Sequence, residues 1–345
     1  MICRPERSSI CGKEQSRVGG KEQGGVCGAE QSSVCRPERS EGPAFGRWLF
    51  ASLAFATACA SGGSGGSIEN PVPVATHASV ASAPKADYTQ MFNGKDLSNW
   101  DIKFAKHELG DNFNNTFRVE DGLFKVRYDK WIKWDGEFGH IFYKQNYAYY
   151  LVAAEYRFNG KQVTGAGSAL AWALRNNGIM VMGQSAESMG LNQDFPISLE
   201  VQLLGGLGTG KRPTANLCTP GTNVHFGEKL ITAHCTNSTS QTYDGDQWVR
   251  VEALVLGDSI IKHIANGDTV LTYRKQEMGG GNANNTKPGV LVNGQPITRG
   301  SISLQAETAE IDFRKVEILN LEGCMDPRAK SYKPYFIKHD AAACK

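Results

Sequence analysis

The sequence predicts an all-β sandwich. Gly accounts for 39 of the 345 residues, and segments of alternating apolar and polar residues are separated by turns rich in Gly, Asn and Asp. This pattern is typical of short strands joined by tight turns rather than of helices. A chain of this length can hold one large β domain or two domains.

The first 46 residues are predicted to be a disordered low-complexity tract. The sequence at residues 3–8, CRPERS, recurs at residues 35–40, and the tract lacks the apolar residues that a core requires. It is either a genuine low-complexity tail or non-coding DNA translated from a start codon assigned too early, and we favour the second interpretation.

Residues 47–59 are predicted to be a secretory signal, because Arg47 precedes a short apolar run that ends in small residues. The run is too short for a comfortable membrane span. Its end, residues 56–59, resembles a bacterial lipobox in which Cys59 is lipidated; ordinary signal-peptidase cleavage is the alternative. Residues 60–87, rich in Ser, Gly, Ala and Pro, are predicted to form a flexible tether. We therefore expect a protein of the bacterial cell envelope, in the periplasm or at the outer membrane. It would be secreted or lipid-anchored, and it would meet the membrane only through that anchor.

The charges give no sign of a nucleic-acid partner. The chain holds 37 Lys and Arg against 35 Asp and Glu, and the first 50 residues hold eight and six of them, so the remainder holds 29 of each. No basic stripe of the kind that binds phosphate backbones is left in the folded part.

Four cysteines in the predicted folded part indicate disulfides. Cys218, Cys235, Cys324 and Cys344 are an even number, which fits two bridges in an oxidising compartment. We predict the pairs Cys218–Cys235 and Cys324–Cys344, because each closes a short loop. A zinc site is the rival interpretation, but no Cys-x-x-Cys pair supports it.

Alternation predicts the strands in chain order. The predicted strands and hairpins cover residues 117–126, 149–158, 197–204, 247–255, 259–274, 301–307 and 311–318. In 149–158 the apolar face starts at Tyr150, while Glu155 and Arg157 share the other face as a surface ion pair or as part of a groove. In 197–204, Leu199, Val201 and Leu203 form a core face; Ser198, Glu200 and Gln202 form the opposite face. Residues 176–178, Asn-Asn-Gly, are predicted to be a tight turn.

Two motifs around this central strand carry a resemblance. Residues 175–179 read RNNGI and residues 200–204 read EVQLL. They resemble the R-N-S-G-I and E-V-Q motifs of the 3-keto-disaccharide hydrolase domain family, formerly DUF1080; Asn177 in place of Ser is a mild departure. Similar motifs at residues 91–100 and 300–307 extend the resemblance over residues 88–321. It implies a concanavalin A-like, jelly-roll β-sandwich of two antiparallel sheets that acts on sugars. Residues 322–345 resemble a small module of secreted bacterial proteins, and we expect a disulfide-closed tail.

A groove on one sheet is the expected saccharide site. Its predicted substrate-binding residues are Arg175, Asn177, Gln202, Trp248 and Gln305. Glu200 is the candidate general base, and His140 or Lys144, reaching in from a loop, is the candidate acid or enolate stabiliser.

The resemblance implies cleavage of glycosides already oxidised at C3. A ketone at C3 acidifies the C2 hydrogen, so a base can remove it and the C1 oxygen can leave. No cofactor is evident; a divalent metal could stabilise the enolate, but no ligand cluster indicates one. Direct glycoside hydrolysis normally needs two carboxylates, and the central strand offers a carboxylate and an amide. The non-enzymatic alternative is a carbohydrate-binding or envelope-scaffold lipoprotein on the same fold.

Overall fold

The structure, a computed structural model, describes Val80, residues 82–163, Gly165 and residues 168–345, all within the compact unit Asn70–Lys345. The predicted low-complexity tract, the signal segment with Cys59 and most of the tether lie outside the described residues. The end of the predicted tether belongs to the domain, because Val80 and Ala83 are buried in an apolar cluster. Within the described part of the chain, none of the helices has the length and apolar character needed to span a bilayer.

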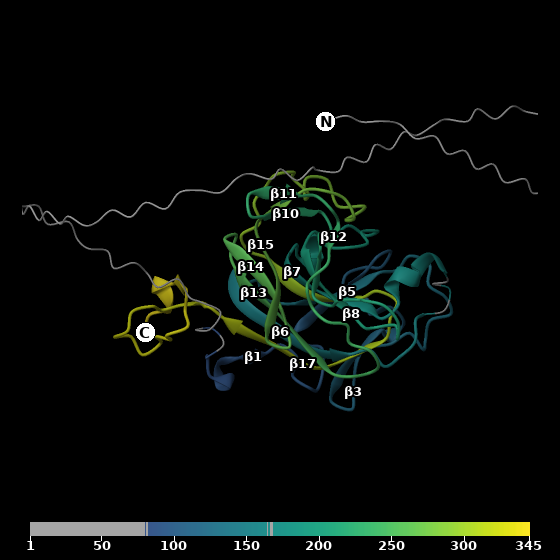
Figure 1. Ribbon diagram of the computed structural model, residues 1–345, viewed down its shortest axis with the longest axis horizontal. Helices are drawn as coiled ribbons and strands as arrows, with labels where there is room; N and C mark the ends of the chain where they lie inside the picture. The colour runs from purple at the N-terminus through teal and green to yellow at the C-terminus, as the bar shows by residue number, and fades with distance from the viewer. Residues whose placement is uncertain (1–79, 81, 164, 166–167) are drawn as a thin grey trace, which may run out of the picture. The chain divides into compact units, whose positions relative to one another are not determined.

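Two large antiparallel sheets confirm the predicted sandwich (Figure 1). The ten-stranded sheet runs, in spatial order, β11 (Lys229–Ile231), β10 (Thr222–Phe226), β15 (Asp268–Met278), β14 (Ile260–Ala265), β13 (Val249–Leu256), β6 (Tyr149–Arg157), β17 (Ile311–Asn320), β4 (Leu123–Val126) and β3 (Phe117–Glu120), with β1 (Thr89–Gln90) also paired to β17. The seven-stranded sheet runs β12 (Cys235–Thr236), β9 (Asn216–Cys218), β8 (Leu199–Leu204), β7 (Asn176–Gly183), β16 (Ser301–Ala306), β5 (Gly139–Tyr143) and β2 (Trp100–Phe104).

Short elements complete the chain. The parallel pair β18 (Glu322–Gly323) and β19 (Lys338–His339) lies in the tail. The 3-10 helices are η1 (Lys85–Asp87), η2 (Phe113–Asn115), η3 (Ser168–Ala173), η4 (Ala186–Ser188) and η5 (Ala341–Ala343).

The core lies between the two sheets and follows the predicted alternation. On β6, Tyr150, Val152, Ala154 and Tyr156 are buried in it, and β8 supplies the set that starts at Leu199. Because successive strand side chains point to opposite faces, the intervening residues of β8 lie on the outer face of the seven-stranded sheet. The predicted tight turn at residues 176–178 is wrong: these residues begin β7, and the positive φ of 46° falls one residue earlier, at Arg175.

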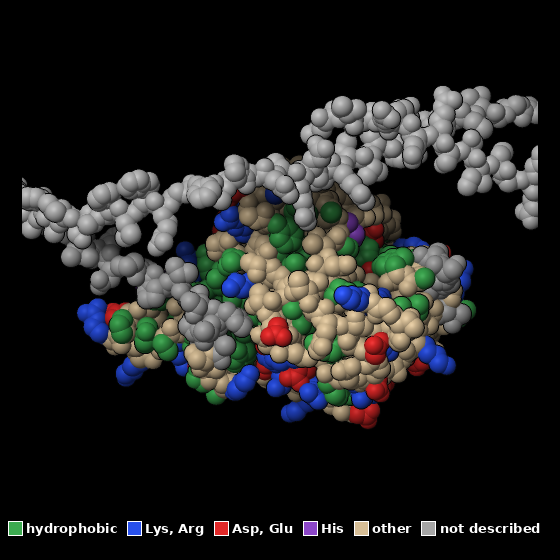
Figure 2. Space-filling view, viewed as in Figure 1, with side chains coloured by type: hydrophobic (Ala, Val, Ile, Leu, Met, Phe, Trp, Pro, Cys, Tyr) green, Lys and Arg blue, Asp and Glu red, His purple; other side chains and the backbone are tan. Residues whose placement is uncertain are grey.

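Part of the outer face of the ten-stranded sheet carries charged side chains that pair with one another. Glu155 accepts hydrogen bonds from Arg250 at 3.2 Å and Arg314 at 2.7 Å. Trp248 lies between two guanidinium groups, those of Arg157 and Arg314, each 4.7 Å from its ring. Trp248 is therefore on the opposite sheet from the expected site, and its predicted role in substrate binding is wrong, because strand β13 belongs to the other layer. Acidic and basic side chains are also interspersed over the face shown in Figure 2.

Both predicted disulfides are confirmed. Cys218 and Cys235 are joined across the β9–β12 pair with Cα atoms 4.1 Å apart, and Cys324 and Cys344 close the tail with Cα atoms 4.8 Å apart. The tail packs through Tyr335 on the same cluster that buries Val80. Figure 1 shows the tail beside the start of the domain, where Lys333 donates a hydrogen bond to Asp87 at 2.9 Å.

Candidate active site

A pocket of about 360 Å³ opens on the outer face of the seven-stranded sheet. Its polar floor comes from strands: Asn176 from β7, Glu200 and Gln202 from β8, and Glu307 from the end of β16. This volume is at the lower end of the range of about 300–1,000 Å³ that is usual for small-molecule sites. The pocket therefore suits a small ligand rather than a long stretch of polymer.

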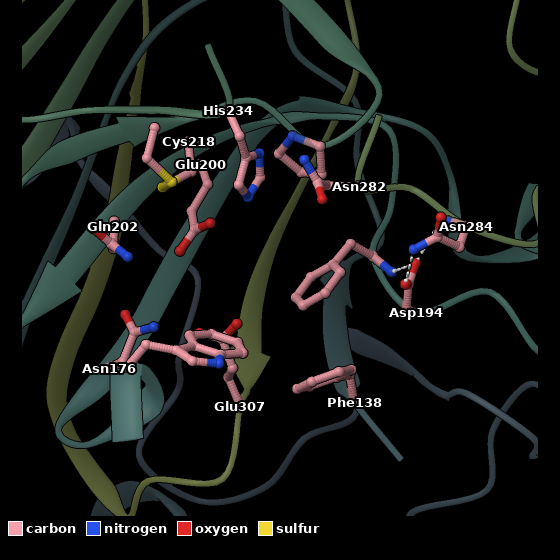
Figure 3. Close-up of a pocket in the computed structure, with 14 residues that line it drawn as sticks. Phe138, Asn176, Asp194, Glu200, Gln202, Cys218, His234, Asn282, Asn284 and Glu307 are labelled. Atoms are coloured by element: carbon pink, nitrogen blue, oxygen red, sulfur yellow. Dashed lines mark hydrogen bonds between the residues drawn. A yellow bond between two sulfur atoms is a disulfide. The ribbon is translucent and has the colours of Figure 1, made fainter. Parts of the chain in front are cut away.

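Glu200 and Glu307 reach the pocket from different strands. Figure 3 shows their carboxyl groups extending into it from opposite sides. Glu200 is 5% exposed and Glu307 4% exposed. The central strand supplies one carboxylate and one amide, as expected, and Glu307 at the end of β16 adds a second carboxylate.

The missing side chain of Gly178 makes this arrangement possible. A Cβ atom on Gly178 would lie 2.5 Å from Glu200 Oε1 and 2.9 Å from Gln305 Oε1. Real Cβ atoms do not approach other atoms so closely, so the Glu200 side chain lies over β7 in space that only glycine leaves open. This is the close backbone approach for which a strand glycine is suited.

Burial raises the pKa of both carboxyl groups. The pKa of Glu200 rises from its ordinary 4.5 to about 8 because the ionised form loses its hydration. The pKa of Glu307 is raised well above its ordinary value, first by burial and then by the negative charge of Glu200. Because each group opposes the ionisation of the other, their two protons leave in separate steps, with one carboxylate and one carboxylic acid present in between. The pair can thus offer a base and an acid together.

Several buried polar atoms around this pair have no partner among the described residues. They are Asn176 Oδ1, Glu200 Oε1, Glu307 Oε2, both amide atoms of Gln305 and both ring nitrogens of His140. Buried polar groups are normally hydrogen-bonded. Several unpartnered polar atoms at one pocket indicate a binding site, because the polar groups of a bound ligand would supply the hydrogen bonds that these atoms lack.

Apolar rings form the other walls. Phe138, Trp172, Phe195 and Pro220 line the pocket, and the rings of Phe138 and Phe195 lie 4.8 Å apart. Trp172, on η3, is 51% exposed. Sugars present apolar C–H faces beside polar hydroxyl groups, so rings facing a polar floor suit a saccharide.

The rim is built from loops that hydrogen bonds tie together. Asp194 accepts from the Asn284 main chain at 2.8 Å and from its side-chain amide at 2.7 Å. These two loops are 90 residues apart in sequence, and Figure 3 shows their contact.

His234 and the Cys218–Cys235 disulfide form the remaining wall. Nitrogen and sulfur atoms of these three residues lie within 4.8 Å of one another. They do not fit a metal site, because both sulfurs are joined in the disulfide and cannot act as thiolates. Among the described residues this is the one His, Cys, Asp and Glu grouping with suitable spacing.

The structure brings some predicted site residues together and separates others. Glu200 and Gln202 line the pocket, and Gln305 lies against Glu200 over Gly178. His140 is on strand β5 rather than on a loop, is fully buried, and pairs in register with Gln305. Burial lowers the pKa of His140 to about 3, with Lys103 adding to the effect, so its ring is neutral beneath the floor.

Three predicted residues lie outside the pocket. Lys144 is on the surface, where it donates to Ser98 O at 2.9 Å and pairs with Asp101 at 3.6 Å. Asn177 points to the opposite face of β7, where Nδ2 donates to Gln305 O at 2.8 Å. The Arg175 guanidinium lies 5.6 Å from the Phe158 ring. The predicted site roles of these three are corrected, because the chain begins β7 at Asn176 and Lys144 follows the end of β5.

Sequence reasoning missed Glu307, Asn176 and the loop residues. Glu307 had a usable signal, since it shares a face with Gln305 two residues earlier. Asn176 was hidden by the predicted turn. Phe138, Asp194 and Asn284 belong to loops far apart in sequence, and no local pattern shows that they meet.

The fold and site together define a concanavalin A-like sandwich with a small-ligand pocket on its outer sheet face. Residues 87–319 match the family described as a 3-keto-alpha-glucoside-1,2-lyase-like domain. The match covers more than half of the chain, and the chain belongs to this family, which confirms the resemblance and indicates a saccharide-related function.

Solved structures with a similar arrangement have low sequence identity. A candidate glycosyl hydrolase of Parabacteroides distasonis is 17% identical, with 71% of this chain and 97% of that chain covered and a TM-score of 0.42. A second one from the same organism is 15% identical, with 68% and 99% covered and a TM-score of 0.40. The beta-glucanase of Bacillus licheniformis is 11% identical, with 68% and 98% covered and a TM-score of 0.37. Among curated proteins, no sequence matches the chain.

Proposed function

We propose that this pocket cleaves glycosides whose sugar carries a ketone at C3, by elimination across C1 and C2 followed by addition of water. The observation that carries the proposal is the Glu200–Glu307 pair, two buried carboxyl groups with raised pKa values on one polar floor. The family description, a 1,2-lyase-like domain for 3-keto-alpha-glucosides, supports the same substrate class.

Elimination requires one base and one acid. The Glu200 carboxylate takes the proton from C2, and the C2–H electron pair becomes the C1=C2 double bond. The C1–O bond breaks with its electrons on the departing oxygen, which takes the proton of Glu307. The ketone assists because it spreads the charge that develops at C2.

Water addition reverses these roles. The Glu307 carboxylate takes a proton from water, the hydroxide adds at C1, and Glu200 returns its proton to C2. The product is a 3-keto sugar, so the overall change is hydrolysis and both residues recover their starting states. We assign the base to Glu200 because burial alone disfavours its ionisation, whereas ionisation of Glu307 is opposed both by burial and by the charge of Glu200. A base works best when its pKa lies near the working pH.

The second carboxylate also brings direct hydrolysis of unoxidised glycosides into consideration. A retaining enzyme needs one carboxylate that is ionised and ready to attack C1. Here burial disfavours ionisation of both groups. Elimination suits this pair better, because it needs a proton acceptor with a high pKa.

The test compares 3-keto-glucosides with their unoxidised parents. We expect the purified protein to cleave only the oxidised forms, and Glu200→Gln to lower kcat by about a thousandfold or more, since it removes the base. Glu252→Gln, on the outer face of the other sheet, is the matched control and should retain activity.

Each other outcome points elsewhere. Cleavage of the parent glycosides would favour direct hydrolysis. Saccharide binding without turnover of either form would identify a carbohydrate-binding protein. Activity lost with EDTA and restored by a divalent cation would add a metal to the mechanism. Equal cleavage by wild type and Glu200→Gln would contradict the proposal.

We also propose that the protein works in the bacterial envelope, anchored through Cys59. The two disulfides support an oxidising compartment. Cys59→Ala should move the protein from the membrane fraction of expressing cells to the soluble fraction. An unchanged distribution would contradict the anchor.

A further inference from the structure

The amide of Asn216, beneath one side of the pocket floor, has a single possible orientation. Its Oδ1 accepts from the main-chain N–H of Ser238 at 2.9 Å, and its Nδ2 donates to the main-chain oxygen of Pro213 at 3.0 Å. A main-chain N–H can only donate and a main-chain oxygen can only accept, so the oxygen and nitrogen of this amide cannot exchange places. The side chain is buried, 1% exposed.

Asn216 in turn fixes the amide of Gln202. The two residues pair in register on strands β9 and β8, and Asn216 Nδ2 donates to Gln202 Oε1 at 2.9 Å. Turning the Gln202 amide round would set two NH2 groups against each other, so Oε1 stays on Asn216 and Nε2 lies on the other side. Gln202 lines the pocket, and Figure 3 shows its amide nitrogen directed into it. None of the described residues accepts a hydrogen bond from this Nε2, so its N–H groups are available to a ligand.

The proposed reaction needs such a donor beside Glu200. As the C2 proton leaves, negative charge develops on the C3 oxygen, and a positioned hydrogen-bond donor stabilises that charge. Gln202 follows Glu200 by two residues on β8, so both side chains leave the same face of the strand. The described residues that line the pocket include no Lys or Arg that could supply the donor instead.

Other polar groups near Glu200 do not offer a donor of fixed direction. The ring of His234 hydrogen-bonds to the main chain of Thr219. Gln305 is fully buried, is not among the residues that line the pocket, and turns its Oε1 toward the space above Gly178 where Glu200 lies. Neither amide atom of Gln305 has a partner among the described residues, so nothing fixes which of them faces Glu200.

Asn176 lies nearer the proposed acid than the proposed base. Leu304 pairs with Ile179 across the antiparallel strands β16 and β7, so three residues further along, Glu307 lies opposite Asn176. Asn176 therefore belongs to the part of the floor where the leaving oxygen is protonated. Gln202 remains the donor on the side of the base.

We propose that Gln202 is a further catalytic residue, whose Nε2 donates a hydrogen bond to the C3 oxygen as that oxygen gains charge, and that Asn216 is a positioning residue, which holds the Gln202 amide in the required direction. The inference rests on the proposed function and names the group that stabilises its intermediate. Asn216 is not among the residues that line the pocket, so it acts only through Gln202.

Substitution of Gln202 tests the donor. Gln202→Met keeps the length of the side chain and removes the N–H, so kcat on a 3-keto-glucoside should fall about a hundredfold with a smaller change in KM. Gln202→Glu keeps an oxygen for Asn216 but restores no donor, and should not recover the activity. A rise in KM with unchanged kcat would show that Gln202 only binds the ground state, and would overturn the inference.

A double-mutant cycle tests the positioning role of Asn216. Asn216→Ala frees the Gln202 amide to rotate, so kcat should fall about tenfold in the wild-type background. In the Gln202→Met background the same substitution should cost nothing further, because the group that it positions is already gone. Equal losses in both backgrounds would show that Asn216 does not act through Gln202.

Asn112 supplies a matched control for the loss of a structural asparagine. Its Nδ2 donates to Phe117 O at 2.6 Å and its Oδ1 accepts from Phe117 N at 3.0 Å, away from the pocket lining. Asn112→Ala should lower the melting temperature and leave kcat unchanged at temperatures where the variant is folded. The Gln202 variants keep the test decisive if Asn216→Ala fails to fold.

The outcomes separate the inference from the proposed function. If wild type cleaves 3-keto-glycosides, Glu200→Gln does not, and Gln202→Met equals wild type, the inference alone is overturned. If wild type neither cleaves nor binds these sugars, the proposed function fails, and the inference fails with it.

Discussion

Gly178 decides where the central carboxyl group can lie. The Glu200 side chain occupies the volume that any other residue at position 178 would fill. Strand glycines usually weaken a sheet. Gly178 is therefore expected to lower local stability, but it leaves the space in which the Glu200 side chain approaches Gln305 and Glu307. A sequence reading sees the glycine as a turn signal, and only the register of β7 against β8 explains it.

We expect Gly178→Ala to abolish most activity. The new Cβ would collide with Glu200 Oε1 and Cγ, at 2.5 and 2.6 Å, and push the carboxyl group out of place. A displacement of about 1 Å can cost a hundredfold in rate, so we expect kcat to fall by roughly that factor. Gly183→Ala is the control on the same strand, because its Cβ would meet its nearest atoms at 3.4 Å. Equal kcat values for the two variants would contradict the role of Gly178.

The raised pKa of Glu200 also predicts how stability depends on pH. A carboxyl group whose pKa is higher in the folded state than in the unfolded chain binds its proton more tightly when folded. Its contribution is fully present below pH 4.5, and is lost as the pH rises toward about 8.

Glu200→Gln should therefore stabilise the protein at alkaline pH while it removes activity. We expect the free energy of unfolding at pH 8.5 to rise by on the order of 1 to 4 kcal/mol, with little change at pH 4. Denaturant titrations at the two pH values measure this. For wild type, kcat/KM should rise with pH, with a midpoint well above 4.5. A variant that is less stable at pH 8.5 would contradict the buried, uncompensated carboxyl group.

Among the elements, the long alternating strands could be predicted from the sequence, whereas several strands that pair with them in the sheets could not. Alternation identified β6, β8, β13 and β16, because one face of each is buried and the pattern survives in the sequence. Strand β5 escaped because its sequence, Gly-His-Ile-Phe-Tyr, ends in three consecutive apolar residues and does not alternate. Strands β9 and β12, of three and two residues, are too short to carry a pattern.

The pocket is built from strands and loops whose contacts with one another cannot be predicted from the sequence. Its floor joins β7, β8 and β16, and its rim joins loops near Phe138, Asp194 and Asn284. Glu200 was predictable from its place on an alternating strand. Glu307 was predictable as a groove-facing residue but not as the partner of Glu200, because the order of strands in the sheet had to be known.

Arg212 illustrates how one side chain positions an element. Its guanidinium donates to main-chain oxygens of Trp172 at 3.3 Å, Leu174 at 2.6 Å and Arg175 at 3.2 Å, and to Gly205 O. It therefore fixes the end of η3, which carries the Trp172 ring to the pocket, and the residues that follow η3. The planar fork of arginine suits several acceptors at once.

Arg212→Lys should loosen Trp172 and weaken substrate binding. Lysine cannot reach all four oxygens, so we expect KM to rise about tenfold and kcat to change less, since the chemical groups stay in place. Steady-state kinetics on the 3-keto substrate measure both. Arg274→Lys, on an exposed strand, is the control. A loss confined to kcat would contradict a role through Trp172.

For the whole molecule, the tail belongs to the fold rather than hanging from it. Leu151, Leu254 and Leu319 on the outer face of the ten-stranded sheet are buried with Tyr335 of the tail and Val80 from before the first strand. The two ends of the domain thus cover one apolar area of a sheet that is otherwise charged. The pocket lies on the outer face of the seven-stranded sheet. The packing of the tail and the proposed chemistry are therefore on different sheets.

We expect Tyr335→Ala to destabilise the protein without changing its chemistry. The ring is 5% exposed, and removing a buried aromatic ring costs about 3 kcal/mol or more. The melting temperature should fall while kcat measured below the transition stays at the wild-type value. Tyr332→Ala, at a partly buried position, should have a smaller effect. A fall in kcat at temperatures where the variant is folded would show that the tail communicates with the pocket.

The lengths of the edge strands bear on whether copies of this protein associate edge to edge. An unpaired edge invites strand addition by a second chain, and short edges give it little to extend. Strands β12, β11 and β3 end the two sheets with two, three and four residues, and the disulfide fastens the shortest. The five-residue β2 remains, and there Lys103 turns its ammonium group inward to oxygens of Phe104, His107 and Leu191. A buried charge on the longest edge makes continuous pairing with another chain costly, which favours a protein that stays dispersed at high local concentration.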